Sequence, residues 1–142
     1  MLIREEFFVE AGDYQRAGEA SAAIKRTLKQ LGVGGPVLRR MAVAAYEAEM
    51  NLVIHSLGGM LTLSVEPPMA YLDSKDTGPG IPDIKAAMRE GFSTANEQAR
   101  SLGFGAGMGL SNMQRNANSF DIQSGPGEGT SIRMTFDLER SL

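Results

Sequence analysis

Apolar residues recur along the chain at two spacings, one of three to four residues and one of two residues. The longer spacing is typical of a helix with one buried face, and the shorter of a half-buried strand. Asp13 is expected to cap the first helix, and glycines to end the first two helices. The helical spacing predicts helices over residues 14–31, 37–55, 84–89 and 108–116.

Alternation and β-branched residues predict five strands. In the last of them Arg133 alternates with Ile132, Met134 and Phe136, so one face of the sheet should be buried. Helices packed on one face of a mixed, mostly antiparallel sheet make a two-layer α/β sandwich of the α+β class. The predicted strands cover residues 3–10, 60–65, 69–74, 120–123 and 130–138.

The composition indicates one soluble globular domain spanning residues 1–142, with 42% hydrophobic and 22% charged residues. A net charge of −3 provides no basic footprint for nucleic acid or for an anionic membrane. No apolar run approaches the roughly 18 residues that span a bilayer. The absence of cysteine excludes disulfides and thiolate metal sites, and the charged N-terminus does not resemble a signal peptide. We therefore expect a cytoplasmic protein.

The helix predicted over 37–55 is mostly apolar, and the polar exceptions in its second half are Glu47, Glu49, Asn51 and His55. Glu47, Asn51 and His55 are spaced four residues apart and so share one face. Because unpaired polar groups are costly to bury, they either bond neighbouring backbone groups or line a polar cavity. Glu49 points the other way, and we expect it to be a solvated surface residue.

Two glycine clusters enclose the polar segment from Asp76 to Leu110. The first follows a predicted strand as Asp76-Thr-Gly-Pro-Gly-Ile81, and its carboxylate is either an acceptor for a ligand amino group or part of an Asx turn. The second cluster, at 103–109, precedes a predicted helix. It is either a phosphate site made of free N–H groups or an ordinary flexible connection.

The sequence lacks the common motifs of other nucleotide-binding proteins. The P-loop pattern is absent, Gly-x-Gly-x-x-Gly fails at Met108 and Leu110, and the His-Arg-Asp and Asp-Phe-Gly signatures of eukaryotic-type kinases are missing.

Four ordered segments carry a resemblance to a known superfamily. They are Glu47-x-x-x-Asn51, Asp76-x-Gly78-x-Gly80, Gly105-x-Gly107-x-Gly109 and Gly129-Thr130. In this order they resemble the N, G1, G2 and G3 boxes of the GHKL ATPase/kinase superfamily, which folds as a Bergerat-type ATP-binding domain. Within it the chain is similar to the bacterial anti-sigma factor/serine-protein kinase family of RsbT- and RsbW-like switch kinases.

The resemblance implies a role for each matched residue. Glu47 would be the general base, and Asn51 would offer its amide oxygen to Mg²⁺ bound with the ATP phosphates. Asp76 and Thr130 would read the adenine. Residues 82–102 would form an ATP lid, and His55 is expected to have a structural role. The remaining nucleotide contacts implied are Gly78, Gly80, Ile81, Gly105, Gly107, Met108, Gly109 and Leu110.

The resemblance implies an ATP- and Mg²⁺-dependent serine/threonine protein kinase that acts as a regulatory switch. Its expected partners are a STAS-type antagonist protein that it phosphorylates, and a sigma factor or phosphatase, with a homodimer left open. The segment Asn96 to Arg100 is longer than in the switch kinases, which leaves partner choice open. The alternative is a non-catalytic, nucleotide-gated module that sequesters a sigma factor or activates a phosphatase.

Overall fold

A computed structural model describes residues 2–56, 58–76, 88, 109–125, 127 and 129–139. Its helices are α1 (Glu19–Gln30), α2 (Gly35–His55) and α5 (Gly109–Asn116). Its strands are β1 (Ile3–Val9), β2 (Gly59–Glu66), β3 (Met69–Asp76), β4 (Ser119–Gly125) and β5 (Gly129–Asp137). The helix expected over 84–89 and the lid expected over 82–102 lie outside the described residues, apart from Met88.

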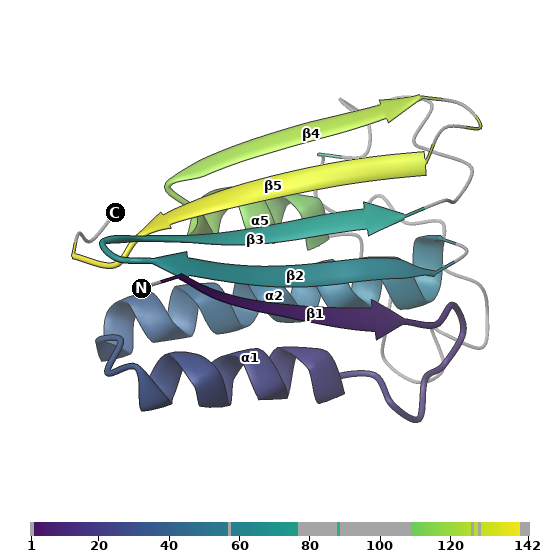
Figure 1. The fold of residues 1–142 in the computed structure, drawn as a ribbon. Helices are drawn as coiled ribbons and strands as arrows, with labels where there is room; N and C mark the ends of the chain where they lie inside the picture. Colours follow the sequence, from purple (N-terminus) through teal and green to yellow (C-terminus); the bar gives the residue numbers. More distant parts are fainter. Residues whose placement is uncertain are drawn as a thin grey trace.

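The five strands form one sheet in the order β1-β2-β3-β5-β4, with β1 and β4 at the edges (Figure 1). Each pairing between these strands is antiparallel, so the parallel pairing of a mixed sheet is not found in the described part of the chain. In the view of Figure 1, α2 and α5 pass behind the strands, and α1 lies below β1 and packs against α2. The predicted α+β two-layer architecture is therefore confirmed.

The core lies between the helices and the inner face of the sheet. Ile132, Met134 and Phe136 of β5 are at most 2% exposed, as their alternation with Arg133 predicts. The helix α2 supplies a run of fully buried alanines (Ala44, Ala45 and Ala48), which lets its backbone approach the neighbouring elements closely. This close packing holds α2 as a rigid support for the polar residues on its other sides.

The start of α1 differs from the prediction. The helix begins at Glu19, and its N-cap position is Gly18, with φ of 101°. Asp13 instead accepts a hydrogen bond from the Arg16 backbone N–H at 3.3 Å within the preceding turn. Tyr14 still packs against the core, so the apolar spacing continues through a segment that is not helical.

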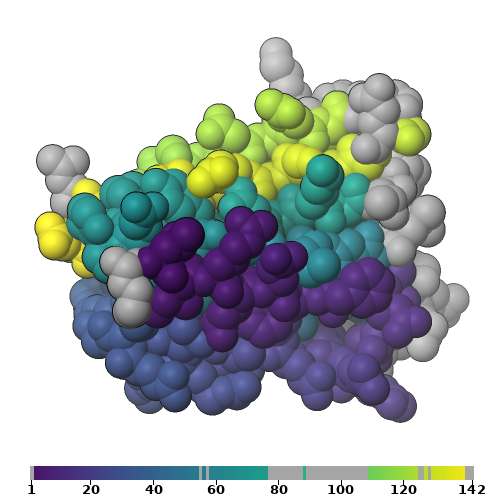
Figure 2. Space-filling model, in the orientation of Figure 1, coloured from purple at the N-terminus to yellow at the C-terminus, as the bar shows by residue number. Residues whose placement is uncertain are grey.

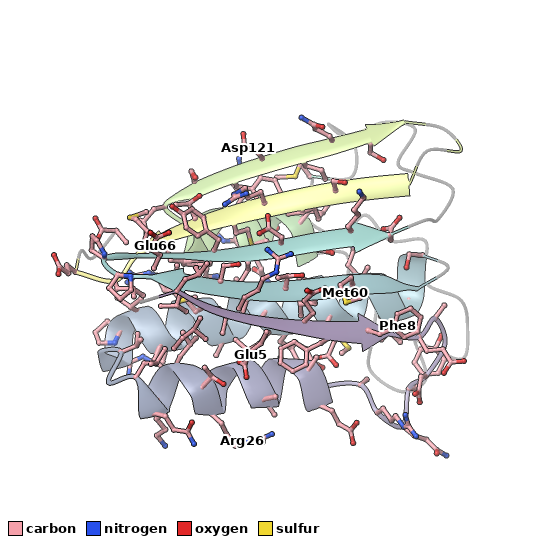
Figure 3. All side chains as sticks on the ribbon, viewed as in Figure 1. Glu5, Phe8, Arg26, Met60, Glu66 and Asp121 are labelled. Atoms are coloured by element: carbon pink, nitrogen blue, oxygen red, sulfur yellow. The ribbon has the colours of Figure 1, made fainter. Side chains whose placement is uncertain are left out.

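The opposite face of the sheet is turned toward the viewer in Figure 2, and no helix of the described residues covers it. Arg133 lies 3.8 Å from the Asp73 carboxylate and 4.5 Å from the centre of the Tyr71 ring. Burial raises the pKa of Asp73, and the Arg133 and Arg4 charges partly oppose that rise. Phe8 and Met60 are partners in the β1–β2 register at one end of this face (Figure 3).

None of the helices in the described part of the chain is long and apolar enough to cross a membrane.

Candidate functional site

Four chain segments that are distant in sequence meet at one end of the sandwich, on the right in Figure 1. They are the C-terminal end of α2, the C-terminal end of β3, the first residues of β5 and the first turn of α5. The described members of the predicted site lie on these segments. The fold thus gathers Glu47, Asn51, Asp76, Gly109, Leu110 and Thr130 toward the same end.

Glu47 lies half-buried on α2 and faces the start of α5. Its Oε1 atom accepts a hydrogen bond of 3.4 Å from the Asn112 amide. Its Oε2 atom lies so close to Gly109 that a Cβ there would be 3.1 Å away. Burial raises the pKa of Glu47, and the Asn112 hydrogen bond lowers it in part. A carboxylate with a raised pKa accepts a proton more readily than an ordinary glutamate, as a general base must.

Asn51 follows Glu47 by one helical turn on the same stripe and is also partly exposed. Its neighbours Leu52 and Val53 are buried in the core, at 0% and 3% exposure. The stripe therefore lies at the edge of the core, where Glu47 and Asn51 are both partly exposed. His55 is the last residue of α2, and its side chain lies outside the described residues.

Glu49 is not a solvated residue, contrary to our expectation. Its side chain is buried, at 2% exposure, and accepts hydrogen bonds from the backbone N–H groups of Gly18, Ala20 and Ser21 at 3.0, 3.2 and 2.9 Å. The first N–H groups of a helix have no partner within it, and their positive dipole end favours an anion. Glu49 thus caps α1 from the neighbouring helix, and the local sequence before α1 contains no sign of it.

Asp76 and Thr130 join the ends of two neighbouring strands. The Oδ1 atom of Asp76 accepts a hydrogen bond of 2.9 Å from the Thr130 backbone N–H, and both residues are less than 10% exposed. The Thr130 hydroxyl lies 2.8 Å from that of Ser124, which donates to the Gly129 carbonyl at 3.1 Å. The bond between the Thr130 N–H and Asp76 joins the two residues predicted to read the adenine. Ser124 lies just beyond the strand predicted over 120–123 and is not among the predicted site residues.

Two glycines allow the backbones around Asp76 to approach each other. A Cβ on Gly129, whose φ is +79°, would lie 2.3 Å from the Asp76 carbonyl oxygen. A Cβ on Gly59 would lie 2.2 Å from the Lys75 carbonyl oxygen. Real Cβ atoms do not approach backbone so closely, so both positions require glycine. The sequence analysis assigned glycines after the helix over 37–55 only the role of ending that helix. In the structure Gly59 is the first residue of β2, and its backbone lies against that of β3.

The two glycine clusters of the prediction are only partly described. Gly109 is the first residue of α5, and Leu110 is a core residue at 7% exposure, so any nucleotide contact it makes would come from its backbone. The other predicted contacts, Gly78, Gly80, Ile81, Gly105, Gly107 and Met108, lie outside the described residues.

Among the described residues of the predicted site, Asn51 is the one expected to contact a metal ion. Among the described residues no three His, Asp, Glu or Cys side chains are grouped so that they could hold a metal ion. Mg²⁺ commonly takes one or two protein oxygens together with phosphate oxygens and waters, which is what a lone Asn51 amide oxygen offers.

A surface pocket of about 360 Å³ lies elsewhere, between β1, α1 and α2. Its lining includes Glu49 and Val53 but neither Glu47, Asn51 nor Asp76. It is therefore separate from the residues gathered at the end of β3.

The chain is similar to known proteins over most of its length. Residues 37–140 match the family described as histidine kinase-, DNA gyrase B-, and HSP90-like ATPase. The chain is 30% identical over 113 residues to the serine/threonine-protein kinase RsbT of Bacillus subtilis, covering 77% of this chain and 79% of that protein. It is 36% identical over 107 residues to an anti-sigma F factor of Caldanaerobacter subterraneus, covering 69% and 68%. An anti-sigma F factor of Bacillus licheniformis is 29% identical over 133 residues, covering 89% and 88%.

Proposed function

This chain belongs to the family of histidine kinase-, DNA gyrase B- and HSP90-like ATPases, in its anti-sigma factor and serine kinase branch, and from that premise we propose that it is an ATP-dependent serine/threonine protein kinase acting as a regulatory switch. Membership of the family implies ATP binding. The protein substrate proposed is a STAS-type antagonist, and the released or controlled partner is a sigma factor or phosphatase.

The observation that carries the proposal is the environment of Glu47. The side chain is half-buried with a raised pKa, and lies where α2 meets the start of α5. A module that only binds nucleotide has no need of a proton acceptor there. In the proposed reaction Glu47 takes the proton of the attacking serine or threonine hydroxyl, whose oxygen forms a bond to the γ-phosphorus while the bond to the β-phosphate oxygen breaks and ADP leaves.

The other site residues would bind and orient the nucleotide. Asn51 would present its amide oxygen to Mg²⁺, which neutralises charge on the phosphates when bound. Asp76, held by the Thr130 N–H at 2.9 Å, would accept a hydrogen bond from the adenine amino group. The backbone at Gly109 and Leu110 would contribute to the phosphate cradle at the start of α5. We propose the same cradle role for Gly105, Gly107 and Met108, and close approach to the base for Gly78, Gly80 and Ile81.

A matched pair of variants tests this assignment of binding and chemistry. Asn51→Ala should lose Mg²⁺-dependent ATP binding in calorimetry, whereas Glu47→Gln should bind Mg-ATP with an unchanged Kd. Tight Mg-ATP binding by Asn51→Ala would contradict the ligand role of Asn51, and loss of binding in Glu47→Gln would contradict a purely chemical role for Glu47.

The second candidate is a nucleotide-gated module that binds a sigma factor or phosphatase without catalysis. It is favoured by the similarity to proteins named as anti-sigma F factors. The two functions differ in one observable, because only the kinase transfers phosphate from ATP to a protein side chain.

A further inference from the structure

The structure places a short chain of polar side chains behind the proposed base. Asn112, on the first turns of α5, donates from Nδ2 to Glu47 Oε1 at 3.4 Å. Asn112 in turn accepts at Oδ1 a short hydrogen bond from Arg115 Nη2, one turn further along α5. The other oxygen of the Glu47 carboxylate, Oε2, also faces α5, since a Cβ added at Gly109 would lie 3.1 Å from it.

The direction of this chain follows from the chemistry of its members. A guanidinium can only donate hydrogen bonds, whereas a side-chain amide has one donating and one accepting end. Arg115 therefore selects the orientation of the Asn112 amide in which the oxygen faces Arg115 and the NH₂ group faces Glu47. In the flipped orientation the amide oxygen would face the carboxylate and repel it.

A carboxylate is a better base when its reactive oxygen is held in one direction. We propose that Asn112 is a positioning residue for Glu47, and that Arg115 acts through Asn112 by fixing the orientation of its amide. This proposal rests on the proposed function, in which Glu47 is the general base. It concerns residues outside the four matched segments, none of which contains Asn112 or Arg115.

Other groups near Glu47 do not replace this contact. Along α2, burial and the Glu47 and Glu49 carboxylates raise the pKa of Tyr46, so its phenol stays neutral near pH 7. The Glu49 carboxylate is engaged by the start of α1. Among the described residues of α5, the neutral Asn112 faces Glu47, and the charged Arg115 bonds to the far side of the Asn112 amide.

Kinetics of matched variants test the positioning role. Asn112→Leu keeps the approximate volume but removes the donor, and should lower kcat for phosphoryl transfer by about tenfold while KM for ATP stays within about twofold. Arg115→Leu should lower kcat by a smaller factor, and Arg115→Lys, which keeps a donor, should recover most of that loss. Gln114→Leu, which removes an exposed amide from the same helix, is the control and should leave kcat unchanged. Unchanged kcat in Asn112→Leu, or an equal fall in Gln114→Leu, would overturn the proposal.

A double-mutant cycle and a spectroscopic readout separate this proposal from the proposed function. If Asn112 acts through Glu47, then Asn112→Leu should have no further effect in the Glu47→Gln background. In the NMR spectrum of the protein alone, Glu47→Gln should shift the Asn112 side-chain amide signals and leave those of Asn118 in place. Unmoved Asn112 signals would overturn the positioning role even if Glu47 proves essential. Full activity in Glu47→Gln would refute the base while shifted amide signals would still establish the contact.

Discussion

Two glutamates on α2, only two positions apart, have opposite surroundings. Glu49 faces α1 and is buried at 2% exposure with three backbone N–H groups bonded to its carboxylate. Glu47 faces α5, is half-buried, and has a 3.4 Å hydrogen bond from Asn112. On one side of α2 the Glu49 carboxylate is buried and hydrogen-bonded to backbone, and on the other side the Glu47 carboxylate is half-buried and faces the candidate site.

Under the proposed function, one helix serves both structure and chemistry. The Glu49 carboxylate satisfies donors that α1 cannot satisfy itself, so its hydrogen-bonding capacity is used for folding. The Glu47 carboxylate is partly desolvated without comparable compensation, which raises its pKa and leaves it ready to take a proton. Energetic cost at a functional residue is a common feature of active sites.

The largest effect should separate the two residues in catalysis. Glu47→Gln should lower the rate of phosphoryl transfer by about 10²–10⁴-fold, the range typical of losing a general base. Glu49→Gln should transfer phosphate at close to the wild-type rate at a temperature where it is folded, because Glu49 faces away from the site. Single-turnover kinetics with saturating ATP measures both. An equal loss of rate in a folded Glu49→Gln protein would break the distinction.

The second effect should separate them in stability. Glu49→Ala leaves the buried N–H groups of Ala20 and Ser21 without an acceptor, and should destabilise the fold by about 3 kcal/mol, given about 1–3 kcal/mol for each such group. Glu19→Ala is the control, since Glu19 is an exposed acid in the first turn of the same helix. It should cost less than about 1 kcal/mol. Urea unfolding followed by circular dichroism measures both, and equal costs would contradict the capping role.

A smaller effect is expected from crowding the Glu47 carboxylate. Gly109→Ala would place a Cβ 3.1 Å from Glu47 Oε2, so the carboxylate must move by a few tenths of an ångström. We expect kcat to fall by about tenfold, since small displacements of a catalytic group are costly, with an unchanged unfolding midpoint. The control is Gly34→Ala, whose Cβ would meet no atom within 4 Å. A kcat unchanged in Gly109→Ala would show that the carboxylate adapts freely.

The smallest effect concerns pH and follows from the raised pKa of Glu47. Between the ordinary value of 4.5 and the higher pKa in the fold, the folded protein binds more protons at Glu47 than the unfolded chain. This residue's contribution to stability therefore falls as pH rises through that window. Glu47→Gln should gain stability relative to wild type as pH is raised from 4 to 7 in urea titrations. A difference that is constant with pH, or of opposite sign, would contradict the raised pKa.

Much of the fold could be predicted because its elements are marked by local patterns. The apolar run of α2 and the alternation around Arg133 gave helix and strand positions to within a few residues. The start of α1 was wrong because Glu49, which caps it, comes 28 to 31 residues later in the chain. A local search for a cap selects Asp13, which has the right chemistry in the wrong place.

The candidate site shows the same difference between local and long-range signals. Glu47, Asn51 and Asp76 were proposed as site residues from side-chain spacing and from the glycines that follow Asp76. Asn112, Ser124 and the need for glycine at position 59 were not, because each depends on an atom brought close by the sheet or by helix packing. Gly59 faces the backbone of β3, and the residues around Gly59 in the sequence give no sign of this contact.

The measurement that tests the central claim most directly is the fate of the γ-phosphate of ATP. The protein is mixed with γ-labelled Mg-ATP and a panel of STAS-domain proteins from the same cell, quenched, and the label is counted on serine or threonine, as inorganic phosphate and as ATP. A serine/threonine kinase predicts label on a serine or threonine of one STAS protein, present with wild type and with Glu49→Gln and lost with Glu47→Gln. Bound ATP whose label stays in ATP, or appears only as inorganic phosphate, would contradict the account.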